Sequence, residues 1–156
     1  MHPNTVRVQE ALRAGGSDIS VVELADAATT AVLAAEALGV SVGQIANSLV
    51  FAADGDAVLV LTSGANRVDT AKVATLLGAA KVTRADADLV RTATGFAIGG
   101  VAPVGHATAL PVLIDEDLAQ YDEIWAAGGT PHTVFRSTYD ELTRLSGARP
   151  ADVRRD

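Results

Sequence analysis

The sequence contains no cysteine among its 156 residues, and aromatic side chains make up only 4% of it. The absence of cysteine excludes a thiol nucleophile, a disulfide framework and any metal site with cysteine ligands. The three histidines, His2, His106 and His132, lie far apart and lack the spacing of a metal-binding motif. We therefore expect no metal and no cofactor, and a core built from alanine, valine and leucine.

No apolar run approaches the length of about eighteen residues that a membrane-spanning helix needs, so we expect no contact with membranes. The first residues show no charged segment followed by an apolar run, which predicts a cytoplasmic protein without a signal peptide. The net charge of −7 disfavours a surface that coats nucleic acid, although it permits contact with the tip of an RNA. The length is typical of one domain, expected to cover residues 1–156.

Helical and strand patterns alternate along the chain and predict a mixed α/β domain. The clearest signal is a hairpin, because the apolar runs 46–53 and 57–62 flank the turn sequence Asp54-Gly55-Asp56. Capping residues and terminal glycines predict helices from Asn4 to about Ala14, from Thr29 or Thr30 to Gly39, from Asp69 to near Gly78, from Asp86 to Gly95 and from Thr138 to Gly147. Further strands are expected at Ile19–Leu24, Lys81–Thr83, Leu110–Ile114, Glu123–Ala127 and Thr133–Arg136.

Residues 94–106 form the most unusual segment, with four glycines and one proline between a helical pattern and a strand pattern. Glycine lets backbone N–H groups approach a ligand closely. Such a loop can present amide donors to an oxyanion or a phosphate without using a reactive side chain. A plain glycine-rich turn beside an edge strand accounts for the same composition, so composition alone leaves both interpretations open.

An ordered series of motifs, from about Val21 to Val153, resembles the YbaK/prolyl-tRNA editing domain family. A single G-x-x-x-P match arises easily by chance, whereas the ordered series is specific. The matching segments are Gln44-Ile45-Ala46-Asn47-Ser48-Leu49-Val50-Phe51, Arg67-Val68-Asp69, Thr94-Gly95-Phe96, Gly99-Gly100-Val101-Ala102-Pro103-Val104-Gly105, Pro111-Val112-Leu113-Ile114-Asp115 and Gly128-Gly129.

This resemblance implies a twisted, partly barrel-like mixed sheet with helices packed around it. It also implies an enzyme that acts in trans and hydrolyses mischarged aminoacyl-tRNA, with proline tRNA carrying a small residue such as alanine or cysteine as the expected substrate. The 3′ end of that tRNA is then the expected partner, and prolyl-tRNA synthetase is a second one. The oligomeric state is left open.

The chemistry of the ester bond suggests which residues form the site. Hydrolysis passes through a tetrahedral oxyanion, for which the main-chain N–H groups of Gly100 and Val101 are the candidate donors. Ser48, Ser63 and Ser137 lack a nucleophile-elbow pattern, which favours direct attack by water, oriented by a hydroxyl of the terminal ribose as the resemblance implies. The expected catalytic residues are Gly99, Gly100, Val101 and Asn47, and the expected substrate-binding residues are Ala102, Pro103, Gly105, His106, Gly128, Gly129 and His132.

Asn47 stands where the resemblance implies lysine, in a Q-I-x-K-[ST]-L pattern. Its amide donates hydrogen bonds but cannot supply a positive charge to a terminal phosphate or ribose. Three hypotheses stay open: a weakened editing enzyme, an editing enzyme with another cation nearby, and a non-catalytic module that binds aminoacyl-tRNA without turnover. Lys72 is a candidate for that cation, although its expected place on a helix gives no support. Hydrolysis of a small ester or amide unconnected with RNA is a further alternative.

The remaining candidates have a structural interpretation beside the functional one. His106 is a candidate to orient the aminoacyl group or a water, or else a hydrogen-bonded surface histidine. His132 is a candidate for the pocket wall or for packing at a strand edge. Asp115 and Asp69 are expected to cap helices, and Thr94 is expected to hold the glycine loop in shape.

Overall fold

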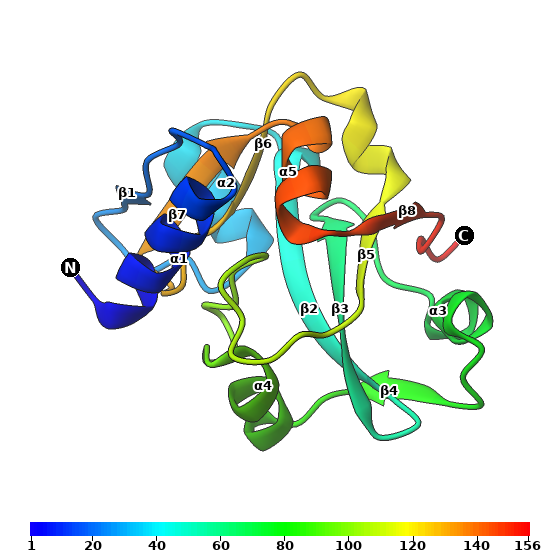
Figure 1. Ribbon diagram of the computed structural model, residues 1–156. Coiled ribbons are helices and arrows are strands. Elements are labelled where there is room, and N and C mark those ends of the chain that lie inside the picture. The colour runs from blue at the N-terminus through cyan, green and yellow to red at the C-terminus, as the bar shows by residue number, and fades with distance from the viewer.

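A computed structural model describes all of residues 1–156 (Figure 1). Five α-helices and two short 3₁₀ turns surround one eight-stranded sheet. The helices are α1 (Pro3–Ala14), α2 (Ala31–Leu38), α3 (Thr70–Leu77), α4 (Ala87–Thr94) and α5 (Tyr139–Ser146), and the 3₁₀ turns are η1 (Val42–Gln44) and η2 (Glu116–Gln120). The strands are β1 (Val22–Glu23), β2 (Ile45–Ala53), β3 (Asp56–Ser63), β4 (Val82–Arg84), β5 (Val112–Asp115), β6 (Ile124–Ala127), β7 (Thr133–Ser137) and β8 (Arg149–Ala151).

The strand order is β1-β7-β6-β2-β3-β5-β8, and β4 adds to β2 outside this path. The pairs β2–β6, β3–β5 and β5–β8 are parallel, while the other pairs are antiparallel. The predicted mixed α/β fold is therefore confirmed. The order ends at β1 and β8, which do not pair with each other, so the sheet is not closed into a barrel.

The β2–β3 hairpin is the longest pairing in the sheet and is confirmed as predicted. Its turn places Asp54 at φ 51° and Gly55 at φ 91°, the left-handed conformation that two-residue hairpin turns require. The Asp54 carboxylate also accepts hydrogen bonds from the N–H groups of Ala80 and Lys81, which lower the pKa of this carboxyl. The turn thereby connects the hairpin to the segment that enters β4.

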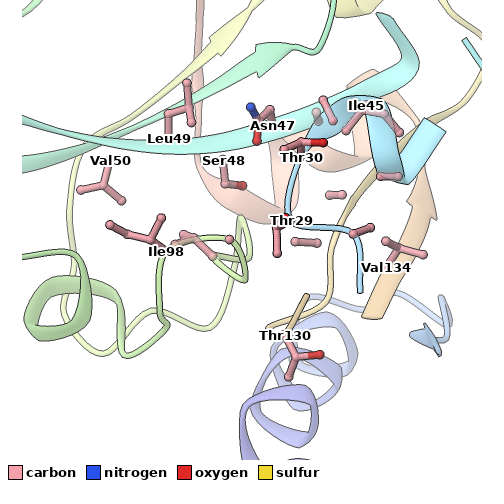
Figure 2. A pocket seen from close by; sticks show the side chains of 18 of the residues that line it. Thr29, Thr30, Ile45, Asn47, Ser48, Leu49, Val50, Ile98, Thr130 and Val134 are labelled. Carbon is pink, nitrogen blue, oxygen red and sulfur yellow. The ribbon is translucent and has the colours of Figure 1, made fainter. Parts of the chain in front are cut away.

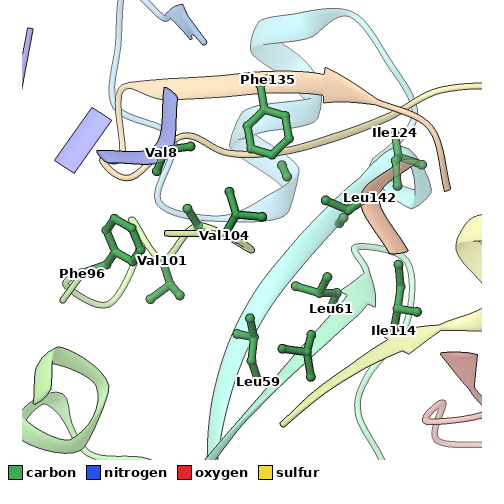
Figure 3. Packing of buried hydrophobic residues seen from close by; sticks show 14 of the residues in the cluster. Val8, Leu59, Leu61, Phe96, Val101, Val104, Ile114, Ile124, Phe135 and Leu142 are labelled. Carbon is green, nitrogen blue, oxygen red and sulfur yellow. The ribbon is translucent and has the colours of Figure 1, made fainter. Parts of the chain in front are cut away.

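The central strand β3 is buried on both faces, and its residues alternate between two cores. Val58 and Val60 pack in a cluster with α3, while Leu59 and Leu61 face a larger cluster on the other side. That larger cluster includes residues of α1, α4, α5 and the glycine-rich loop, as Figure 3 shows for several of its members. The loop is thus part of the main core rather than a surface turn.

Most of the predicted helix starts are confirmed, since the side chains of Thr30, Asp69, Asp86 and Thr138 accept hydrogen bonds from the first turns of α2, α3, α4 and α5. Asp115 caps η2 as expected. None of the helices combines the length and the apolar character that crossing a lipid bilayer requires.

Three details of the predicted elements are wrong. The cap of α1 is His2 rather than Asn4, and its Nδ1 accepts a hydrogen bond from the Asn4 N–H at 3.0 Å. Pro3 occupies the first helical position, where the N–H that proline lacks would have no partner within the helix. The strand expected over 19–24 shortens to β1, since only Val22 and Glu23 pair with β7. Strand β8 is absent from the predicted elements, and its Pro150 is tolerated because the strand lies at a sheet edge.

Candidate functional site

A pocket opens where the sheet leaves one edge of β2 unpaired. On this edge β2 pairs with β6 at Ile45 and Ala46 and with β4 from Phe51 to Ala53, so residues 47–49 have no partner strand. The pocket has a volume of about 330 Å³. Its lining residues are Ala28, Thr29, Thr30, Ala31, Ala34, Ile45, Ala46, Asn47, Ser48, Leu49, Val50, Arg84, Ala85, Val90, Ile98, Gly99, Val101, Trp125, Ala126, Ala127, Thr130, Thr133 and Val134.

Segments far apart in the sequence close this pocket around β2 (Figure 2). The segment 28–31, which leads into α2, forms one wall, and the glycine-rich loop forms another through Ile98, Gly99 and Val101. Residues 125–134, from β6 through the following turn to β7, form a third. The walls are mostly aliphatic or hydroxyl-bearing side chains, so the pocket favours a short, weakly polar group.

Ser48 projects from β2 into this pocket. Figure 2 shows Ser48 and Val50 on the side of the strand where Thr29, Ile98 and Thr130 lie, as expected from the alternation of side chains along a strand. Ser48 Oγ is buried and has no hydrogen-bond partner in the chain. Trp125 Nε1, in another lining residue, is also buried without a partner. Polar atoms in this state are uncommon in folded proteins, because each costs about 1–3 kcal/mol.

Asn47 lies on the opposite face of β2 from Ser48, beside Leu49 (Figure 2). Asn47 is nevertheless among the residues that line the pocket, and its Cα pairs with that of Thr62 in β3. Lys72 does not supply the charge that Asn47 lacks. Its ammonium forms salt bridges with Asp152 at 3.0 Å and Asp156 at 3.4 Å, and neither these residues nor Lys72 line the pocket.

Of the two amides expected to act as oxyanion donors in the glycine-rich loop, one is free. The Gly100 N–H donates to the Ala97 carbonyl at 3.0 Å, so this donor is occupied and the prediction of an oxyanion donor there is corrected. Gly100 is instead required for packing, because an added Cβ would lie 3.0 Å from the Thr130 Cα. The Val101 N–H has no acceptor within the chain, and Val101 lines the pocket. Gly99, at φ 89°, also lines it.

Side chains from other elements hold this loop in place. Arg7 of α1 donates to the carbonyl of Gly105 at 2.8 Å and to that of Thr94 at 3.4 Å, and its guanidinium lies 4.4 Å from the centre of the Phe96 ring. The Thr94 hydroxyl donates to the Val90 carbonyl at 2.6 Å and accepts from the Phe96 N–H at 3.0 Å. Thr94 therefore supports the loop as predicted, and the position of Val101 is set by a rigid framework.

His106 belongs to this supporting framework and does not line the pocket. Its Nε2 lies 2.8 Å from the Ala102 carbonyl, and since a carbonyl only accepts, Nε2 carries the proton. Burial lowers the pKa of the imidazole below its ordinary value of 6.5, and the nearby charge of Arg7 lowers it further, against the opposing effect of the hydrogen bond to Ala102. The ring packs edge-on against Phe96.

The other expected substrate-binding residues also lie outside the pocket lining. Ala102 and Pro103 are buried within the loop, and Gly105 packs against the Arg7 backbone. Gly128 and Gly129 shape the turn between β6 and β7, where a Cβ on Gly129 would lie 2.8 Å from the Asn4 carbonyl oxygen of α1. His132 is exposed on the same turn, whose Thr130 does reach the pocket.

The pocket lacks side chains that could transfer a proton near neutral pH. Arg84 is its only charged or titratable lining residue, since no histidine, aspartate, glutamate, lysine or tyrosine reaches it. No group of three or more histidine, aspartate or glutamate side chains gathers where it could hold a metal ion. The chemistry that this arrangement offers is binding, orientation and hydrogen bonding to a developing negative charge.

Sequence reasoning missed Ser48, Trp125, Thr130 and Arg84 as pocket residues. Ser48 was detectable, because it stands two residues before the buried Val50 and therefore on the inward face of the strand. The others come to the pocket from β4, β6 and the turn after β6, and only the strand order brings these segments next to β2.

Residues 25–145 match the aminoacyl-tRNA editing domain family. The uncharacterized protein YwhH of Bacillus subtilis is 33% identical over 127 residues, which cover 81% of this chain and 80% of that protein. The proline–tRNA ligase of Desulfovibrio desulfuricans is 34% identical over 117 residues, which cover 74% of this chain but only 19% of the ligase.

Among solved structures, a crystal structure of a proposed trans-editing enzyme for prolyl-tRNA synthetase is 49% identical in sequence. The two folds agree with a TM-score of 0.94 over 100% of this chain and 99% of that one. The sequence motifs, the mixed sheet and these matches agree with one another. The chain belongs to the YbaK family of aminoacyl-tRNA editing domains.

Proposed function

We propose that this protein is a deacylase that acts in trans in the cytoplasm and hydrolyses the ester between a mischarged amino acid and the 3′ end of its tRNA. The family and the likeness to a proposed trans-editing enzyme support this activity. Proline tRNA carrying a small amino acid, such as alanine or cysteine, is the substrate that the similarity to proline–tRNA ligases favours. Prolyl-tRNA synthetase is then the natural partner, since it releases the mischarged product.

The observation that carries this proposal is the pocket itself, in which a free backbone amide meets a small aliphatic cavity without an acid or a base. A water oxygen attacks the acyl carbon, and the carbonyl oxygen becomes an oxyanion that the Val101 N–H stabilises. The ester oxygen then leaves as the ribose hydroxyl, and the free amino acid departs. Because no lining side chain can take the water's proton, the neighbouring hydroxyl of the terminal ribose orients the water and passes the proton on.

The size of the pocket matches a short side chain. A volume of about 330 Å³ lies at the lower end of the range of roughly 300–1,000 Å³ found for ligand pockets. Aliphatic walls discriminate one methylene group by about 1–3 kcal/mol, so we expect alanine to be preferred over larger aliphatic residues by about ten- to a hundred-fold.

The second candidate is a module that binds aminoacyl-tRNA without hydrolysing it, and Asn47 favours it. The family pattern has a lysine at this position, and the pocket contains no lysine at all. Proline tRNA charged with alanine, cysteine or serine, incubated with the protein, separates the two candidates. Ester loss supports the deacylase, and binding without ester loss supports the module. A large gain of turnover in Asn47→Lys would mean that the pocket is competent and lacks only a charge.

The decisive test of the mechanism replaces single backbone amides by esters, which removes an N–H without changing a side chain. At Val101 we expect kcat to fall by about 100- to 1,000-fold, which is typical of losing one oxyanion donor. The same change at Gly100 is the matched control, because that N–H is already bonded to Ala97 and its loss affects only the loop. Equal losses at both positions would contradict the assignment.

The role of the ribose hydroxyl is tested with tRNA whose free terminal hydroxyl has been removed. Unchanged hydrolysis of this substrate would exclude the substrate-assisted route. Hydrolysis of free aminoacyl esters that is insensitive to salt and to added tRNA would instead favour the small-ester alternative.

A further inference from the structure

Arg84 is the only charged residue among those that line the pocket. It stands at the end of β4, where its Cα pairs with that of Phe51 in β2. Residues 47–49, which lack a partner strand on this edge of β2, lie just before that pair. Its side chain is exposed, and its guanidinium carbon lies 5.7 Å from the centre of the Phe51 ring. A cation over an aromatic face is weakly held there without being neutralised, and Phe51 shares its face of β2 with Leu49.

Arg84 has no anionic partner in the chain. The acidic residues next to it in sequence, Asp86 and Asp88, form no salt bridge with it, and its guanidinium donates no hydrogen bond to any group of the chain. Most other basic side chains are engaged. Those bonded to carboxylates or backbone carbonyls are Arg7, Arg13, Lys72, Arg136, Arg144, Arg149 and Arg154.

An unpaired guanidinium at the rim of a neutral pocket suits one class of ligand. Its planar donors match two oxygens of a phosphate, and it stays charged at any physiological pH. The molecule as a whole carries a net charge of −7, which repels an RNA backbone unless a cation is placed at the point of contact. One free cation beside the pocket is therefore suited to one phosphate group.

From this placement we propose that Arg84 binds the phosphodiester that precedes the terminal nucleoside of the substrate RNA, and so supplies the positive charge that is absent at Asn47. The inference rests on the proposed function only in taking the ligand to be the acylated 3′ end of an RNA. It assigns Arg84 to binding and not to the hydrolytic step. The acyl group then occupies the pocket beside Ser48 and Val101, while the phosphate lies at the β4 side of its mouth.

The test measures the equilibrium binding of an uncharged proline-tRNA acceptor hairpin with an intact 3′ end, over a series of salt concentrations. In Arg84→Ala we expect binding to weaken by about 10- to 100-fold, as for the loss of a hydrogen-bonded charge pair. The slope of log Kd against log salt should become shallower by about 0.7, which corresponds to one single-stranded phosphate contact. Arg84→Lys should keep that slope while recovering only part of the affinity.

Arg149→Ala is the matched control, because Arg149 is an exposed arginine of β8, bonds the Leu76 carbonyl and does not line the pocket. It should leave both affinity and slope unchanged. Affinity and slope that are the same in Arg84→Ala as in the parent would overturn the inference, and so would a parent that does not bind the hairpin. If the parent binds in the expected salt-dependent way but hydrolyses no charged tRNA, the proposed deacylase fails while the assignment of Arg84 stands.

Discussion

Two regions of the sheet contain buried polar side chains that differ in their hydrogen bonding. At the end of β5, the carboxylate of Asp115 is 1% exposed and fully bonded. Its Oδ2 accepts from the Thr62 hydroxyl at 3.3 Å, the Ser63 N–H at 3.1 Å and the Asn66 amide at 2.9 Å, and its Oδ1 accepts from the Asp117 N–H at 3.0 Å. Four donors converge on one buried charge, which is the arrangement of a structural anchor.

At the unpaired edge of β2, by contrast, Ser48 Oγ and Trp125 Nε1 are buried without any partner. One other side-chain atom in the molecule shares this state, Thr5 Oγ1 in α1, and Thr5 does not line the pocket. An unsatisfied buried hydroxyl lowers the stability of the free protein. Buried groups of the two kinds therefore differ: the Asp115 carboxylate is bonded within the fold, whereas the Ser48 hydroxyl is left without a partner in the lining of the pocket.

The largest loss of stability is expected for Asp115→Ala, which tests whether the bonded carboxylate stabilises the fold. The substitution leaves the Ser63 N–H and its neighbouring donors buried without an acceptor, so we expect the free energy of unfolding to fall by about 3 kcal/mol or more. Urea denaturation measures the loss. Asp69→Ala is the control, since this helix cap at the partly exposed start of α3 should cost only about 1 kcal/mol. Equal losses of unfolding free energy in the two variants would show that the Asp115 carboxylate stabilises the protein no more than an ordinary helix cap does.

Ser48→Ala separates the two roles of a buried polar group, because it should lower activity without lowering stability. Removing an unpartnered hydroxyl should leave the free energy of unfolding unchanged or raise it slightly, while deacylation kcat/KM falls about tenfold for one lost hydrogen bond to the substrate. Denaturation and deacylation assays on the same preparation measure both quantities.

Ser63→Ala is the matched serine control on the neighbouring strand. The Ser63 hydroxyl donates to the Gly43 carbonyl at 2.8 Å and does not line the pocket. This variant should therefore lose about 1–3 kcal/mol of stability and keep its kcat/KM at a temperature where it is folded. If Ser48→Ala instead lost stability as Ser63→Ala does, Ser48 would be an ordinary core residue.

Local chemistry explains why much of the fold was predictable. Helix caps such as Thr30 and Asp86 and the Asp54-Gly55 turn act within a few residues, so their signals are present in the sequence itself. The parallel pairs, the short edge strands β1 and β8, and the open sheet depend on contacts between distant segments. No local pattern determines those pairings, and they were accordingly the part that sequence reasoning left open or missed.

The candidate site was less predictable, for the same reason. The motif around the glycine loop indicated Gly99 and Val101, which line the pocket, but it could not show that the Gly100 N–H turns back to Ala97. The position of His106 after the loop made it a candidate substrate-binding residue, whereas its ring bonds the Ala102 carbonyl. A motif locates a segment, and only the packing around that segment decides which of its groups remain free.

The smallest expected effect concerns His106, whose role as a support can be separated from catalysis by pH. Burial lowers the pKa of its imidazole in the folded state, so just below pH 6.5 the unfolded chain protonates it more readily than the folded chain does. The unfolded state then binds the extra proton, so the contribution of His106 to stability is complete above pH 6.5 and is lost as the pH falls toward its lowered folded pKa. In His106→Gln, which keeps a donor for Ala102, the decline in the free energy of unfolding below pH 6.5 should be shallower than in the parent. Urea denaturation from pH 7.5 downward measures this decline, with His132→Gln, a change at an exposed histidine, as the control. A parallel decline in the parent and in His106→Gln would contradict the role of the buried imidazole.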